Sequence, residues 1–457
     1  MVSEQPDAST RTLAPRPRPS QAGDAGAGNG IAPEVLRRRR RQLAAAGAAA
    51  GDVVATATAA IEELHRSIAG RAFAATPASA PVRAVHDRIA GLTYGSVRLA
   101  GRAAGRAAGL AIALSPAATA AALDGPVAGA IQGALSGAFG DRLESAHPAL
   151  AVPMSVRVAG EDIPCTAPAL RSAFPLASAR VAVFLHGLCE TEVSWGRPAL
   201  DDDSPGTYGD RLHRHLGHTP VFVRYNSGLH ISDNGRRLTA LLGALVEAWP
   251  VAVEELALIG HSMGGLLMRS ACDVGRTDGA PWVPLVRHCV YLGVPHDGAP
   301  LERGAHLVAC TLRTLGETRP LARLLEARSA GVKDLRFSYL REEDWRGQDQ
   351  DTAGLIDTGS DLPLLSGARH HVVAATLGRQ PTSLLSRLLG DLLVYHGSAH
   401  GRGRRGAALE VEERSRLDVG GITHFHLLDH PAIYEQLHEW LLGPRRGDEV
   451  VEAGSAG

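Results

Sequence analysis

The sequence Gly260-His261-Ser262-Met263-Gly264-Gly265 separates a short apolar stretch, Leu256 to Ile259, from an apolar helical pattern that begins at Leu266. In a G-x-S-x-G pattern the glycines allow a sharp turn between a strand and a helix, so that the serine hydroxyl is exposed above the sheet. A serine in that turn is strained and lies at a helix N-terminus, which favours developing negative charge. The alternative is a glycine-rich turn in which the serine is merely small. The strand before and the helix after favour Ser262 as a nucleophile.

Apolar strands and helical patterns alternate on both sides of this turn, after a hairpin turned at Gly160. That alternation predicts an α/β fold whose sheet is mostly parallel and carries helices on both faces. Ligands of such folds bind at the carboxyl edge of the strands. The predicted strands are Val181–Leu185, Val221–Tyr225, Leu256–Ile259, Val286–Leu292 and His371–Leu377. The predicted helices cover about 208–216, 233–248, 265–274 and 431–442.

Composition divides the chain into further regions. The first is a tail rich in Pro, Gly, Ser and charge, and such composition predicts disorder. Next comes an Ala/Gly-rich helical region, with helices near 54–68, 82–92, 97–114 and 126–143. Its small residues permit close helix contacts and suit either a packed core or a lipid-facing patch. The regions are a disordered tail 1–42, the helical region 43–148, the α/β domain 149–445 with a helical cap inserted at about 298–368, and a disordered tail 446–457.

A second signal lies upstream, where the apolar strand Val183-Phe184-Leu185 ends in His186-Gly187. In serine hydrolases of this architecture one oxyanion donor is a backbone N–H just after an early strand, and the other follows the nucleophile. Leu188 and Met263 occupy those positions. Taken alone, the His-Gly pair is equally compatible with an ordinary turn at the end of a strand.

A third signal is the segment Gly420-Gly421-Ile422-Thr423-His424 before the helix predicted after Pro431. The base of a Ser, acid, His triad lies on such a loop before the final helix. Three histidines compete for that role, and His424 is favoured over His426 and His430 because it comes first after the glycine turn. No carboxylate or cysteine set accompanies the three at a spacing typical of metal ligands, so no metal is expected.

The acid must then lie between Ser262 and His424. Asp391 is the best candidate, since it is flanked by Gly390 and by apolar residues, and a buried carboxylate would hold the imidazole in the correct tautomer. The rivals are Asp357 and Asp361, which fall in the expected cap, and Asp418, which is close in sequence to the histidine and expected to be solvated.

Charge and cysteine usage exclude several classes of protein. The net charge of -1 gives no reason to expect nucleic-acid binding. The five cysteines are scattered without a C-x-x-C pair, so neither a disulfide framework nor a zinc site is expected. No stretch has the length and apolarity of a membrane span. Arg37 to Arg41 form either a solvated linker end or a site of attraction to an anionic membrane surface. We expect a cytoplasmic protein, with peripheral membrane contact through the N-terminal region as the alternative.

Several segments together resemble the α/β-hydrolases of the lipase or GPI inositol-deacylase-like type, especially those of actinobacteria. The segments, which lie within residues 150–442, are FLHGLCETEVSW, VRYNSGLHISDNGRRL, LALIGHSMGGLLMRSAC, YLGVPHDGAPLE, LLGDLLV and GGITHFHLLDHPAIYEQLHEWL. The resemblance implies an α/β-hydrolase fold, with Ser262 as nucleophile, Asp391 as acid, His424 as base, and Leu188 and Met263 at the oxyanion positions. One departure is Asp297, where an apolar residue is expected between His296 and Gly298.

The resemblance and the triad order imply a serine carboxylic-ester hydrolase, an esterase or lipase that works through an acyl-enzyme and needs no cofactor. Its substrate would be a small-molecule or lipid ester. The resemblance to GPI inositol-deacylase-like proteins does not imply that this protein acts on a GPI substrate. Acyl transfer to an alcohol on the same triad is an alternative, and so is a lipid-binding protein that uses the fold without turnover.

Overall fold

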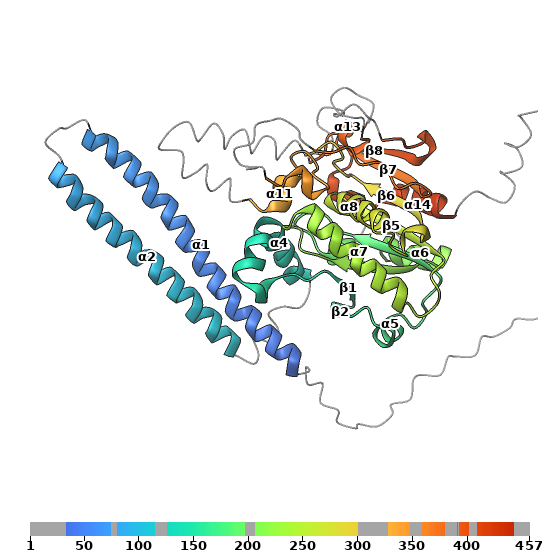
Figure 1. The fold of residues 1–457 in the computed structure, drawn as a ribbon, viewed down its shortest axis with the longest axis horizontal. Helices are drawn as coiled ribbons and strands as arrows, with labels where there is room; N and C mark the ends of the chain where they lie inside the picture. Colours follow the sequence, from blue (N-terminus) through green and yellow to red (C-terminus); the bar gives the residue numbers. More distant parts are fainter. Residues whose placement is uncertain are drawn as a thin grey trace, which may run out of the picture.

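The computed structural model describes residues 33–74, 80–114, 126–196, 206–299, 328–347, 359–379, 391, 393–401 and 409–442. Figure 1 shows two parts, a hairpin of two long helices and an α/β body built around one sheet. The hairpin consists of α1 (Pro33–Ala74) and α2 (Ala80–Leu114).

The sheet has eight strands in the order β2-β1-β4-β3-β5-β6-β7-β8. The strands are β1 (Ser155–Val158), β2 (Glu161–Ile163), β3 (Arg180–Leu185), β4 (Thr219–Arg224), β5 (Glu255–His261), β6 (Val286–Leu292), β7 (Arg369–Thr376) and β8 (Arg416–Gly420). Strand β1 is antiparallel to both β2 and β4, and all pairings from β4 to β8 are parallel. The predicted hairpin and mostly parallel sheet are confirmed, and the architecture is the α/β-hydrolase fold.

Helices cover both faces of the sheet, which is why its central strands are apolar on both sides. The helices that follow the first strand are α5 (Ala167–Ala173), α6 (Tyr208–Leu216), α7 (Ile231–Ala248), α8 (Met263–Thr277), α11 (Ala330–Asp334), α13 (His396–Ala399) and α14 (Pro431–Leu442). Along β3, Val181, Val183 and Leu185 join a core with α7 and α8. Ala182 and Phe184 point to the opposite core, with α6 and α14.

The fold differs from the predictions at three places. Strand β8 was not predicted, because Arg416–Gly420 is a partly exposed edge strand without an apolar run. Helix α1 begins at Pro33, inside the tail 1–42 that composition predicts to be disordered. The two helices expected near 82–92 and 97–114 form the single helix α2.

A third helix of the N-terminal region, α4 (Pro126–Ala146), packs on the α/β body rather than on the hairpin. The side-chain amide of Asn226 donates to the carbonyl oxygen of Gly140 at 3.0 Å. A Cβ on Gly137 would lie 2.7 Å from the backbone nitrogen of Cys189, so α4 approaches the loop after β3 closely. Helix α4 therefore belongs with the body, although composition groups it with the helical region 43–148.

The expected cap falls partly outside the described residues, including the stretch 300–327. The longest described part of it, 328–347, is packed on the body. Asp334 is fully buried and accepts from the backbone N–H of Ile231 at 2.9 Å. The indole of Trp345 stacks on His230, with ring centroids 3.6 Å apart. These contacts join this part of the insertion to the body.

Candidate active site

Ser262 lies at the junction between β5 and α8, in a conformation that side chains rarely adopt, with φ 52° and ψ -123°. Two glycines make this turn possible. A Cβ on Gly260 would lie 2.5 Å from the nitrogen of Gly265, and one on Gly264 would lie 2.4 Å from the carbonyl oxygen of Leu185. The structure thus has the strand, strained turn and helix that the G-x-S-x-G pattern requires.

His424 and Asp391 lie together, although 33 positions separate them in the sequence. The imidazole Nδ1 donates to Asp391 Oδ2 at 2.6 Å, and both side chains are buried. The other carboxylate oxygen accepts from the backbone N–H groups of Leu393 and Val394, at 3.0 Å and 2.8 Å. These contacts fix the carboxylate and leave the proton of His424 on Nδ1. His424 Nε2 is buried without a hydrogen-bond partner in the described part of the chain, so it is available to accept a proton.

The rival histidines have other roles. His426 Nδ1 accepts from the backbone N–H of Thr423 at 3.0 Å, which caps the short helical turn that contains His424. The backbone N–H of His430 donates to the hydroxyl of Tyr208 at 2.7 Å. Neither lines the cavity described below.

Of the rival aspartates, Asp361 and Asp418 lie in the described part of the chain, and neither has a hydrogen bond to His424 there. Asp418 lies on β8, is exposed as the sequence predicts, and binds two other histidines. Asp357 is outside the described residues. Asp297, the departure from the family pattern, donates its backbone N–H to Ser398 Oγ at 3.0 Å and does not line the cavity.

Ser262 and His424 line one cavity of about 370 Å³. The oxyanion candidate Leu188 lines the same cavity, and Met263 is the first residue of α8, where a backbone N–H has no intrahelical acceptor. Apolar side chains make up much of the wall. They are Leu188, Val332, Leu335, Leu393, Val394 and Phe425.

A buried pair that the sequence analysis missed lies beside the nucleophile. Glu190 Oε2 is 3.0 Å from His261 Nδ1 and also accepts from the backbone N–H of Gly187 at 2.8 Å. His261 Nε2 is 3.2 Å from the carbonyl oxygen of His424. The pair therefore joins the loop after β3, the nucleophile turn and the loop of the candidate base.

The pair is an ion pair. Burial alone would raise the pKa of the Glu190 carboxyl, but the charge of His261 and the hydrogen bonds from His261 and Gly187 lower it to about 2. Burial alone would lower the pKa of His261, but the charge and hydrogen bond of Glu190 raise it above its ordinary value. A protonated His261 can donate from both ring nitrogens, to Glu190 and to the backbone of His424.

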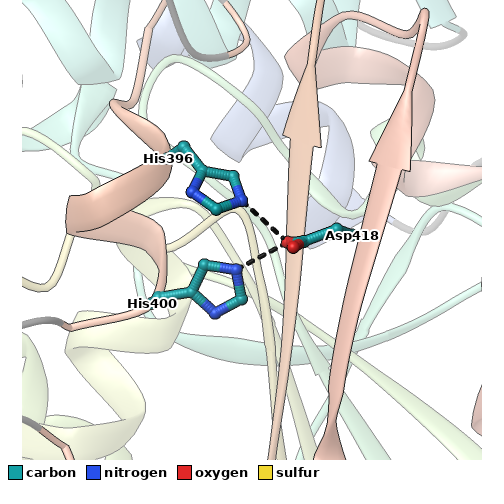
Figure 2. A group of neighbouring side chains, drawn as sticks. All are labelled: His396, His400 and Asp418. Carbon is teal, nitrogen blue, oxygen red and sulfur yellow. Dashed lines mark hydrogen bonds and ion pairs between the residues drawn. The ribbon is translucent and has the colours of Figure 1, made fainter. Parts of the chain in front are cut away.

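A second histidine cluster contains residue types that metal ions prefer. Figure 2 shows His396 and His400 directed at Asp418, with Nε2 to Oδ1 distances of 3.0 Å and 2.5 Å. However, Arg416 donates to His400 Nδ1 at 3.1 Å and also to three backbone carbonyl oxygens that hold it in place. A guanidinium can only donate, so His400 carries its proton on Nε2. That tautomer has no lone pair at Nε2 for a metal, and the cluster fits a hydrogen-bonded link between α13 and β8.

No protein-family model matches the sequence, and no curated protein is significantly similar to it. Among solved structures, the chain is similar to a lipase, BlEst2, of Bacillus licheniformis in its mature form, at 19% identity, over 58% of this chain and 92% of that one, with a TM-score of 0.36. EstA from Clostridium botulinum aligns at 13% identity over 58% and 86% of the two chains, with a TM-score of 0.33. An esterase from the archaeon Pyrobaculum calidifontis aligns at 12% identity over 58% and 76%, also with a TM-score of 0.33. At identities and TM-scores this low, the similarity gives no information about the activity of this protein.

Proposed function

We propose that the protein is a serine hydrolase of the α/β-hydrolase fold, with Ser262 as nucleophile, His424 as base and Asp391 as acid. More particularly, it is a carboxylic-ester hydrolase of the esterase or lipase type. The observation that carries the proposal is the buried Asp391–His424 pair. His424, whose Nε2 has no hydrogen-bond partner in the described part of the chain, lines the same cavity as the strained Ser262. The finer GPI inositol-deacylase-like type is retained only as a sequence resemblance.

In the proposed reaction His424 Nε2 takes the proton of Ser262 as Oγ attacks the ester carbonyl carbon. The carbonyl oxygen becomes an oxyanion, which accepts from the backbone N–H groups of Leu188 and Met263. Each such donor contributes about 100- to 1000-fold to the rate. Collapse of the intermediate breaks the bond to the alcohol oxygen, and His424 gives that oxygen its proton.

Deacylation repeats these steps with water. His424 takes a proton from water, hydroxide adds to the acyl carbon, and the acid leaves as Ser262 regains its proton. Asp391 stays ionised and stabilises the imidazolium in both halves of the reaction. The apolar wall of the cavity supports a substrate whose acyl part is apolar.

Acyl transfer uses the same groups, with an alcohol in place of water, and product analysis with and without an acceptor alcohol separates the two reactions. A lipid-binding protein without turnover would not react at Ser262. The test is labelling with a fluorophosphonate probe and mass spectrometry of the tryptic peptides. We expect one adduct, at Ser262, in the wild type and none in Ser262→Ala. An unlabelled wild type that is folded by circular dichroism would contradict the proposal.

A further inference from the structure

The hairpin of α1 and α2 buries one side of each helix against the other. The helices run antiparallel and approach closely where glycines face each other. A Cβ on Gly47 would lie 2.4 Å from the carbonyl oxygen of Gly105, and one on Gly109 would lie 2.9 Å from the carbonyl oxygen of Leu43. One face of α2 is therefore fully occupied by α1. Figure 1 shows that most of the hairpin extends away from the α/β body.

The opposite face of α2 carries a line of large apolar side chains that are 55% to 70% exposed. Their spacings of three, four, seven and eleven residues place them on one side of the helix along most of its length. We refer to them as the α2 stripe. Its members are Val85, Ile89, Leu92, Leu99, Leu110 and Leu114. Scattered exposed leucines are ordinary, but a continuous exposed apolar line marks a surface that contacts a partner.

Charge on the hairpin identifies the chemistry of that partner. Helices α1 and α2 contain 12 arginines and 5 carboxylates, a net charge of +7, in a chain whose total is -1. Four of these arginines, Arg66, Arg83, Arg98 and Arg102, pair with carboxylates of the hairpin itself. Arg88 and Arg106 are exposed and form no ion pair in the described part of the chain. They precede Leu92 and Leu110 by four residues, which places each beside the α2 stripe.

The arginine run adds positive charge at one end of the stripe. Gly109 of α2 contacts the backbone of Leu43, so Arg40 and Arg41 lie within about one helical turn of the end of α2 near Leu114. The only carboxylate of α2, Asp87, pairs with Arg83 of the same helix. An apolar line flanked by cations is the pattern of a helix that lies in the plane of an anionic lipid surface.

We propose that the hairpin attaches the protein to a membrane surface that contains anionic lipid, with the α2 stripe in the acyl boundary and the arginines at the phosphates. No described helix is long and apolar enough to cross a bilayer, which agrees with attachment in the plane of the surface. A second copy of the chain fits the α2 stripe less well than a lipid surface does. Two α2 helices packed through their stripes would bring Arg88 and Arg106 of both copies together, without carboxylates to neutralise them. The proposal does not depend on the proposed ester hydrolysis.

The test is flotation of the full-length protein with vesicles of phosphatidylcholine, with or without about one third phosphatidylglycerol. We expect binding to the anionic vesicles only, and its loss in 1 M salt, where charges are screened beyond about 3 Å. Leu92→Ser/Leu99→Ser should bind on the order of a hundredfold more weakly. Arg88→Gln/Arg106→Gln should lose about thirtyfold, since each arginine near such a surface contributes about fivefold.

Matched controls lie on exposed positions of the body. Leu176→Ser/Val251→Ser and Arg171→Gln/Arg287→Gln change the same residue types there and should bind as the wild type does. Unchanged binding in both hairpin variants, or equal binding to the neutral and the anionic vesicles, would overturn the proposal. So would a molar mass by light scattering that falls from dimer to monomer in Leu92→Ser/Leu99→Ser, because the stripe would then be a contact between two copies.

Discussion

Glu190 Oε2 and His261 Nδ1 lie 3.0 Å apart in the interior, directly beside the candidate nucleophile. The remaining hydrogen bonds of this pair reach the backbone of Gly187 on one side and of His424 on the other. Neither side chain is a member of the triad. Their contacts position the oxyanion loop and the base loop relative to the nucleophile turn, so the geometry of the site depends on them.

Glu190→Gln should therefore lower kcat by about 100-fold while fluorophosphonate still labels Ser262. The amide keeps the size of the side chain and removes the charge that keeps His261 protonated, so His261 loses its N–H bond to the backbone of His424. Because the variant leaves the buried His261 without a charged partner, its free energy of unfolding should also fall by about 3 kcal/mol. Glu161→Gln, an exposed carboxylate on β2, is the control. Activity within threefold of the wild type would contradict a positioning role.

The pair also gives a pH dependence of stability. The pKa of His261 is raised, so its contribution is complete below the ordinary value of 6.5 and is lost as the pH rises through the raised value. The pKa of Glu190 is lowered, so its contribution is complete above the ordinary value of 4.5 and is lost as the pH falls toward about 2. We expect the difference in unfolding free energy between wild type and His261→Gln to be largest between these two ordinary values. Urea titrations at a series of pH values measure this difference. A difference in unfolding free energy that increases above pH 8 would contradict the expected pH dependence.

Ser262→Ala should lose ester turnover by on the order of a million-fold if the triad acts as a unit. The fold should survive, because the change removes only a hydroxyl. Ser262→Gly should be equally inactive but about 1 kcal/mol more stable than Ser262→Ala, since glycine adopts positive φ without strain. Hydrolysis of p-nitrophenyl esters and thermal unfolding measure the two effects. Substantial activity in either variant would end the assignment of the nucleophile.

His424→Ala should be almost as damaging as the serine change. His426→Ala removes only the cap on the turn at Thr423 and should lose less than about tenfold, through a cost in stability of about 1 kcal/mol. Steady-state kinetics of the two variants side by side distinguish them. If His426→Ala were the inactive variant, the base would have to be reassigned.

Asp391→Asn should lower kcat by about 10⁴-fold, because an amide no longer holds the proton of His424 on Nδ1. Asp361→Asn, at an exposed position in the insertion, should leave kcat unchanged. The two variants should have similar KM values, since neither side chain is expected to contact the substrate.

The sequence predicted the central strands and the nucleophile turn because their signals are local. Val183 and Leu258 lie in apolar runs, and Gly260 and Gly264 mark a turn that a Cβ would block. The Asp391–His424 contact could be proposed only because the order of a triad restricts the candidates. By contrast, no local pattern indicates that Glu190 would meet His261, because 71 positions separate them and only the folded sheet brings them together.

The strand at the edge of the sheet, β8, was also harder to predict, because its contacts are with residues far away in the sequence. Strand β8 has half-buried residues without an apolar run, and its Asp418 is exposed, as the sequence predicts. The histidines that Asp418 binds, His396 and His400, lie 22 and 18 positions earlier in the sequence. A contact between positions that far apart gives no periodic signal in the sequence of the strand.

The order of the site residues along the chain has a consequence for synthesis on the ribosome. Strand β5 and the serine turn are translated long before His424, and the buried Arg211 of α6 meets its partner Asp429 only across 218 positions. Contacts between such distant positions form late in folding, because the long chain segment between them must be ordered first. A nascent chain that ends before β8 would therefore lack the base and expose the apolar surface that α14 covers. Such unfinished chains should be bound by chaperones and remain unable to react with esters until the last helix is released.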